Sequence, residues 1–313
     1  MNALINLIIC TIYLSSFSLQ AEASADFSST KVKVTDLSAQ SAGLDEEIQN
    51  DKMLTKSGSQ SKYSMSVVTG YSGGSLKDPA SKDKKNLFGG DIREEVGAFL
   101  DSSLRYRFNK NSSLTSGIGL FVVQPFHEEK KGQDYNDKIE LTNPYINYSY
   151  FAGRGSWMYS ASASVTIYTR SIYTDEGYRF KPIVSGSLLY NFKSPFQLGI
   201  SLDSGYNFFK SGISKNEFLY DFTFGWHPFV EYQVTDSVSL RTNWDFGLSH
   251  SVFNNSDGGH WDNNLVSQSM GLGISVNRDI YLYPNILVSA QDFYSDASFD
   301  NSTVAISAIL NLF

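Results

Sequence analysis

A set of acidic, basic and histidine residues lies in segments where polar and apolar positions alternate. Side chains of an extended strand point alternately to two faces, so these residues are expected to share a polar face. Such a face can form a passage whose acidic and basic walls sort solutes by charge, or it can hold salt bridges that brace a narrow interior. An unpaired buried charge is costly, so we expect ion pairs under both hypotheses. The candidates are Asp101, Arg105, Arg107, Arg170, Arg179, Asp203, Asp221, His227, Glu231, Arg241 and Asp245.

The histidines are the natural candidates for acid–base catalysis, and they are His127, His227, His250 and His260. Ser249 and Ser251 flank His250, but adjacent residues of a strand point to opposite faces, which does not suit a serine nucleophile. A triad is defined by geometry rather than by sequence position, so a hydrolase stays as an alternative. We do not expect an enzyme.

The segment 254–264 (NNSDGGHWDNN) combines paired acids with a histidine, at Asp257, His260 and Asp262. Its oxygen-rich side chains are of the type that binds calcium, but the spacing of an EF-hand loop is absent. The one cysteine of the chain is Cys10, which precludes thiolate metal sites and disulfides within the mature protein. We therefore expect no metal and no cofactor, and interpret this segment as a polar loop.

The elements that must position these residues are long strands. In the segment 217–234 (EFLYDFTFGWHPFVEYQV), one alternate register is aromatic and apolar and the other is mostly polar. Strands of soluble proteins run about 3–10 residues, whereas a tilted strand that crosses a bilayer needs about 9–11 residues in the lipid alone. The same pattern predicts strands at 62–72, 91–108, 113–126, 139–151, 157–170, 178–192, 196–210, 217–234, 238–250, 264–276, 280–292 and 301–313.

The connections between these strands alternate in length, with long polar loops at the odd positions and tight turns at the even ones. Together with the even strand number, about 12, this predicts an all-β fold, a transmembrane antiparallel up-and-down β-barrel. Charges are absent from the apolar registers, which would face lipid. The prolines at 144, 182, 228 and 284 predict bulges near strand ends, because proline cannot donate to a ladder.

Composition agrees with this architecture. Only 18% of the residues are charged, in a chain of 313 residues. The mean hydropathy is −0.23. The chain contains 19 Tyr and 22 Phe, which suits the aromatic girdles of a barrel. The net charge of −7 includes no basic stripe, so nucleic acid is not an expected partner.

The N-terminal part of the chain, which precedes Lys62, differs from the rest. Residues 1–23 are interpreted as a signal peptide with a small-residue cleavage site at 21–23, or as an N-terminal anchor helix. Residues 24–61 are interpreted as a periplasmic segment with one weak amphipathic helix. This segment is a flexible leader, a helix docked at the periplasmic mouth, or a plug inside the lumen. The barrel itself is expected at 62–313.

These features resemble the outer-membrane β-barrel proteins of Gram-negative bacteria, in the porin-like range of about 12 strands. The shared features are the signal peptide, the alternating strands, the loop asymmetry and a C-terminal strand 304–313 (VAISAILNLF) that ends in Phe313. The resemblance implies that Phe313 belongs to the signal read by the barrel-assembly machinery. It also implies contact with outer-membrane lipid and lipopolysaccharide, and two periplasmic termini.

Taken together, the sequence predicts a narrow porin-like channel for small polar or charged solutes. A barrel of about twelve strands lies between the side-chain-filled barrels of eight strands and the wide channels of sixteen or more. The first alternative is a structural or surface-interaction barrel with a filled lumen. The second is a surface hydrolase of the phospholipase or protease type.

Overall fold

The computed structural model describes residues 62–80, 96–109, 111–126, 139–192, 195–211, 219–251, 260–277, 279–289 and 302–312. The predicted signal peptide, the segment 24–61, His127, Asp257 and Phe313 lie outside the described residues, as do the side chains of His260 and Asp262. Among the described helices, none has the length and hydrophobicity needed to cross a membrane.

The described chain is almost entirely β-structure, with a single short helix, α3 (Ser171–Thr174). The strands are β1 (Tyr63–Ser72), β2 (Gly97–Arg107), β3 (Ser112–Val123), β4 (Ile139–Leu141), β5 (Tyr145–Arg154), β6 (Trp157–Ile167), β7 (Tyr178–Asn191), β8 (Phe196–Tyr206), β9 (Phe208–Phe209), β10 (Phe222–Gln233), β11 (Val238–Ser251), β12 (His260–Ser275), β13 (Ile280–Ser289) and β14 (Ser302–Asn311).

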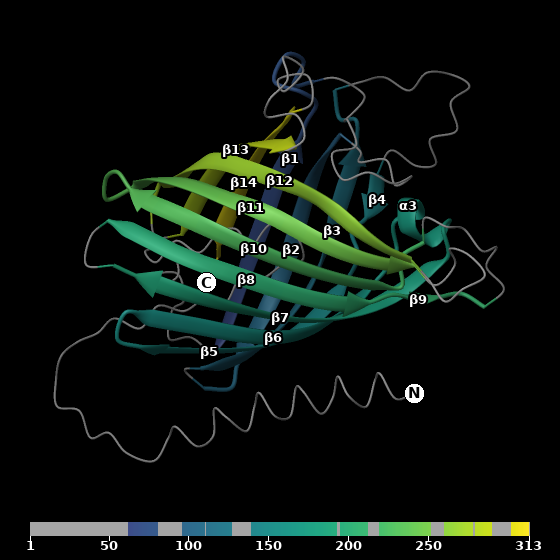
Figure 1. The fold of residues 1–313 in the computed structure, drawn as a ribbon, viewed down its shortest axis with the longest axis horizontal. Helices are drawn as coiled ribbons and strands as arrows, with labels where there is room; N and C mark the ends of the chain where they lie inside the picture. The colour runs from purple at the N-terminus through teal and green to yellow at the C-terminus, as the bar shows by residue number, and fades with distance from the viewer. Residues whose placement is uncertain are drawn as a thin grey trace. The chain divides into compact units, whose positions relative to one another are not determined.

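These strands form one closed antiparallel barrel (Figure 1). Neighbours in sequence pair with each other, and the pairing of β1 with β14 closes the wall. Two of the wall strands are interrupted: β4 and β5 are separated at 142–144, and β8 and β9 at Asn207. Counting each interrupted pair once, the barrel has 12 strands, as the sequence predicted.

The connections alternate in length around the barrel. The turns after β2, β5, β7, β10 and β12 span two to four residues, and the other connections span eight or more. Side chains close several of the tight turns, as asparagine often does. Oδ1 of Asn109 accepts the backbone N–H of Asn111 at 2.8 Å, and Oδ1 of Asn277 accepts that of Asp279 at 2.8 Å. We call the two ends of the barrel the turn end and the loop end; β1 begins and β14 finishes at the turn end.

The two faces of the wall follow the predicted registers. Outward residues such as Leu202 and Leu240 are 43% and 51% exposed, whereas the inward residues next to them, Ser201 and Arg241, are 6% and 3% exposed. In β14 the apolar register faces outward, since Ile306 is exposed and Ser307 is buried. The aromatic register of β10 also faces outward, with Trp226 stacked on Phe246 of β11 at 5.3 Å.

Glycine and aromatic residues interlock on the inner face. A Cβ on Gly199 would lie 2.3 Å from the ring of Phe229, its partner across the β8–β10 ladder. A Cβ on Gly117 would likewise lie 2.5 Å from the ring of its cross-strand partner Tyr145, and a Cβ on Gly70 would lie 2.8 Å from the ring of its partner Phe99. One inner cluster joins Phe229 with residues 151, 158 and 189, and a second joins residues 68, 281, 283 and 309. Inner glycines thus let large rings lie flat against the wall.

Several strand boundaries differ from the prediction. β10 begins at Phe222 instead of 217, and β12 begins at His260 instead of 264, so part of the predicted polar loop is strand. The helix α3 occupies a connection expected to be irregular. The bulge expected near a strand end holds for Pro144, which lies in the β4–β5 break, but is wrong for Pro228 and Pro284, which lie inside β10 and β13.

Candidate functional site

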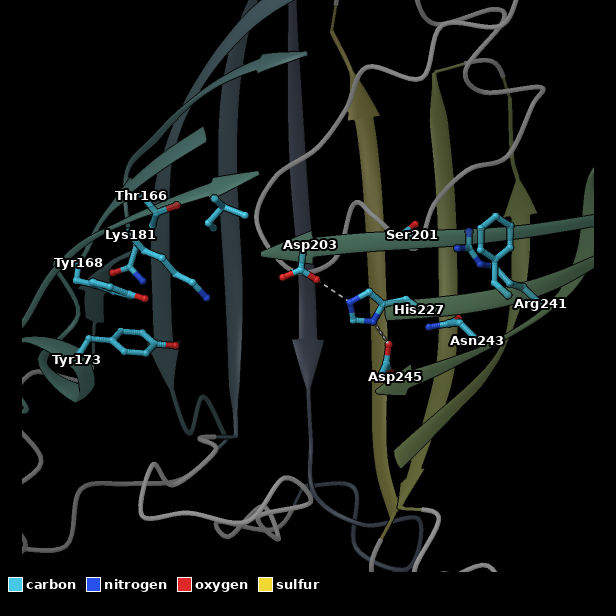
Figure 2. Close-up of a pocket in the computed structure, with 13 residues that line it drawn as sticks. Thr166, Tyr168, Tyr173, Lys181, Ser201, Asp203, His227, Arg241, Asn243 and Asp245 are labelled. Atoms are coloured by element: carbon cyan, nitrogen blue, oxygen red, sulfur yellow. Dashed lines mark hydrogen bonds and ion pairs between the residues drawn. The ribbon is translucent and has the colours of Figure 1, made fainter. Parts of the chain in front are cut away.

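A polar cavity of about 410 Å³ lies against the inner wall, and it extends from the middle of β8 and β10 to the loop ends of β6 and β7. β6, β7, β8, β10 and β11 supply most of its lining. Figure 2 shows Thr166, Lys181, Tyr168 and Tyr173 on one side, and His227, Arg241 and Asn243 on the other. Because neighbouring inward positions are often Ser, Gly, Asn or Thr, the wall leaves space here instead of being filled by side chains.

His227 joins two carboxylates across three strands. Its Nε2 lies 2.8 Å from Oδ1 of Asp203 on β8, and its Nδ1 lies 2.8 Å from Oδ1 of Asp245 on β11. Oδ2 of Asp245 accepts a hydrogen bond from the Ser267 hydroxyl at 3.1 Å. Two carboxylates on one imidazole favour its protonated form, in which both ring nitrogens donate. The cluster then carries a net charge close to −1 at the cavity wall.

Local irregularities of the sheet make room for this cluster. Pro228 has no N–H, and the β10–β11 ladder is interrupted at residues 227 and 228, between the pairs Trp226–Phe246 and Phe229–Asn243. The β11–β12 register shifts by a bulge between Asp245 and Gly247. A Cβ on Gly225 would lie 2.6 Å from Oδ1 of Asp203, so glycine is required beside the cluster.

Arg241 lies on β11, nearer the turn end than Asp245, and is 3% exposed. Its guanidinium carbon lies 4.6 Å from the ring centre of Phe229, in a cation–π contact. Nε and Nη1 of Arg241 are buried without a hydrogen-bond partner. Glu231 stands opposite Arg241 in the β10–β11 register and is 2% exposed, and its Oε2 also lacks a partner. The two side chains form no direct ion pair within the described structure.

Lys181 and two tyrosines face these groups from the other side of the cavity (Figure 2). The Lys181 stem lies over Gly205, where a Cβ would approach Cε to 2.3 Å. The Tyr168 hydroxyl donates to Oδ1 of Asn207 at 2.9 Å. Burial raises the pKa of the Tyr168 phenol, so it remains a neutral hydrogen-bonding group at physiological pH.

A second charged cluster lies at the loop end. Nε of Arg170 lies 3.0 Å from Oε2 of Glu140, and its guanidinium stacks on the ring of Phe121 at 3.7 Å. The backbone N–H of Ser171 donates to Oε1 of Glu140 at 3.1 Å, and the Ser171 hydroxyl donates to the same atom. Oδ1 of Asp101 accepts a hydrogen bond from Thr142 at 2.6 Å. Arg170 and Asp101 are thus held by specific partners.

Asp221 and His250 form a third pair. Nδ1 of His250 lies 2.7 Å from Oδ1 of Asp221, and the His250 ring lies 4.9 Å from that of Trp261. An aspartate on Nδ1 is how a catalytic histidine is oriented. Ser249 and Ser251 occupy the opposite register and are buried, at 3% and 0% exposure. Neither serine shares the face of His250, as the sequence predicted.

The other predicted arginines, Arg105, Arg107 and Arg179, do not line this cavity. Nε of Arg105 donates to the Ser64 hydroxyl at 2.8 Å, and Arg107 finishes β2 at the turn end. Arg179, which was predicted to face the lumen, does not line the cavity around His227. It is exposed and borders a separate hollow with Lys210, Phe180 and Tyr178. An irregular β7–β9 register between Tyr178 and Phe180 disturbs the alternation there.

The structure brings together four of the predicted residues, Asp203, His227, Arg241 and Asp245, around one cavity. It adds Thr166, Tyr168, Tyr173, Ser201 and Asn243, which the sequence analysis missed because uncharged polar residues are common on any inner face. Gly225 and Pro228, which lie within two residues of His227, were the available sequence signal that the strand is irregular at this point. In the described part of the chain, no group of three or more His, Cys, Asp or Glu is arranged to hold a metal ion.

No family model matches the chain, and no curated protein matches it. Among solved structures, the NanC porin is 9% identical over 80% of this chain and 100% of its own, with a TM-score of 0.47. An outer-membrane channel from Pseudomonas putida F1 is 10% identical over 81% of this chain and 97% of its own, with a TM-score of 0.49. Salmonella typhi OmpF in complex with daunomycin is 9% identical over 80% of this chain and 97% of its own, with a TM-score of 0.38.

Proposed function

We propose that the chain is a narrow outer-membrane channel for small polar or charged solutes, with both termini on the periplasmic side. The observation that carries this proposal is the polar cavity in the inner wall, which has charged groups of both signs and is not filled by side chains. A barrel that serves only as a scaffold has no need for such a space. Charged rings and walls are how channels select ions.

The distribution of charge supports selection among solutes. Lys181 and Arg241 face a cluster in which His227 is shared by two carboxylates, so cationic and anionic groups border the same space. Salt bridges alone would brace the lumen equally well, but here they leave a cavity beside them. Neither Ser249 nor Ser251 shares the face of His250, so the Asp221–His250 pair does not favour the hydrolase alternative.

Reconstitution in planar lipid bilayers tests the proposal. We expect discrete single-channel steps from purified protein whose folded state is verified by heat-modifiable migration in electrophoresis. In liposome swelling, glucose should enter faster than the larger stachyose, because the passage is narrow. Folded protein that shows neither steps nor swelling would contradict a channel and favour the filled-lumen barrel.

A further inference from the structure

Arg241 and Thr166 are buried polar side chains with unsatisfied hydrogen-bonding groups in the wall of one cavity. Arg241 is 3% exposed with Nε and Nη1 unpartnered, and Thr166 is 6% exposed with its Oγ1 unpartnered. A buried polar group without a partner costs about 1–3 kcal/mol, and more when it is charged. Both residues line the same cavity, so a ligand held there and drawn toward these side chains is one way to complete their hydrogen bonds.

The chemistry of these groups points to an anionic ligand. A guanidinium offers only donors, in a planar array that matches a carboxylate. The Phe229 ring lies 4.6 Å from the guanidinium carbon of Arg241, a cation–π contact that holds the group against the wall without using its N–H donors. Lys181 adds a second positive charge from across the cavity.

The acidic groups nearby do not abolish this preference. Asp203 and Asp245 direct Oδ1 atoms to His227 at 2.8 Å, so the imidazole offsets part of their charge. Glu231 stands opposite Arg241 and weakens its field, but it makes no direct ion pair that would occupy the guanidinium. With Asp203, Asp245, Glu231, Lys181, Arg241 and a protonated His227 all counted, the charges balance near zero, so a monoanion fits better than a polyanion.

We propose that this cavity binds a small hydroxylated monocarboxylate, with its carboxylate on Arg241 and its hydroxyl groups on neighbouring polar side chains of the cavity wall. The inference deepens the proposed function, since passage through the barrel gives the ligand access to the site. Lys181 then attracts the anion, and Arg241 is the residue that orients it.

Calorimetric titration of the folded protein in detergent with sodium gluconate tests the site independently of conduction. We expect gluconate to bind the wild type, and sorbitol, its neutral analogue, to bind at least about tenfold more weakly, because it lacks the carboxylate. Arg241→Gln should weaken gluconate binding by at least about tenfold. Arg154→Gln, at an exposed position in the turn end of β5, is the matched control and should bind as the wild type does.

Two further variants keep the test decisive if Arg241→Gln folds poorly. Glu231→Gln removes the opposing charge and should strengthen gluconate binding, while Asn243→Asp adds a negative charge to the cavity wall and should weaken it. Equal gluconate binding by the wild type and the folded Arg241 variant would overturn the site. Conduction without gluconate binding would overturn the site alone, and gluconate binding without conduction would overturn only the channel.

Discussion

At the level of single residues, His227 shows how a charged lumen wall can be stabilised without being neutralised. Each imidazole nitrogen of His227 lies 2.8 Å from an oxygen of a different carboxylate, Asp203 or Asp245. All three side chains are about three-quarters buried. Without the ring, the two acids would face the same cavity with no shared partner. The residue therefore sets how much negative charge this part of the wall presents.

Replacing His227 with Ala should make the channel more selective for cations. One additional unit charge acting on an ion about 7 Å away in water changes its energy by about 0.6 kcal/mol, or about two- to threefold for each ion; because K⁺ and Cl⁻ shift in opposite directions, their permeability ratio changes by about sevenfold. The reversal potential under a KCl gradient measures this ratio. The triple variant His227→Ala, Asp203→Asn, Asp245→Asn should lose the added selectivity, and an unchanged reversal potential in the single variant would count against the assigned role of the cluster.

The sequence indicated which charged residues share a face, but it did not indicate which of them contact each other. Alternation put Asp203, Asp245 and Arg241 in polar registers, and all three line the same cavity. It could not show that His227 would bridge two acids, because that contact depends on the register of three strands. Near Arg179, the irregular register between Tyr178 and Phe180 breaks the two-residue period, and the sequence contains no signal for it.

At the level of the strands, contacts between glycine and aromatic residues of neighbouring strands shape the inner wall. Gly199 lies beneath the Phe229 ring, and this ring in turn makes a cation–π contact with the guanidinium of Arg241. The fit between β8 and β10 thus supports the candidate binding residue. Aromatic rings that cover glycines of a neighbouring strand are a known device for stabilising sheets and fixing their register.

Replacing Gly199 with Ala should destabilise the barrel by about 1–3 kcal/mol, as overpacking does in a filled interior. The new Cβ would lie 2.3 Å from a ring that is only 1% exposed and has little room to move. Gly186→Ala is the matched control, because its nearest neighbour would be the Ser160 carbonyl oxygen at 3.4 Å. Urea unfolding in lipid vesicles should separate the two variants; equal stabilities would show that Phe229 repacks freely.

The number, order and facing of the strands could be predicted from alternation and loop length, but their ends could not. The residues 260–263 (HWDN) resemble a loop by composition, yet they pair with residues 248–251 of β11 and extend β12. Pairing with a long neighbouring strand outweighs weak local β-propensity there. Pro228 is likewise tolerated inside β10, where the ladder to β11 is interrupted.

At the level of the whole barrel, a closed wall of 12 strands separates an apolar exterior from a polar interior. Closure removes the free edges that would otherwise leave backbone groups unpaired in lipid. Two inner clusters of large apolar side chains narrow the interior, while the charged cavity remains beside Phe229. This combination fits the narrow passage proposed above better than it fits a wide pore.

The central question is whether the cavity lies on the path of ions, and cysteine modification answers it. The only cysteine, Cys10, falls within the predicted signal peptide, so single cysteines can be placed without background. Lys181→Cys places a thiol in the cavity wall, and Leu202→Cys places one on the outer face, where the leucine is 43% exposed. A bulky charged methanethiosulfonate reagent, added during planar-bilayer recording, should sharply reduce the current through the Lys181 variant and leave the Leu202 variant unchanged. Full modification at position 181 with no change in current would show that ions bypass the cavity, contrary to the proposed channel.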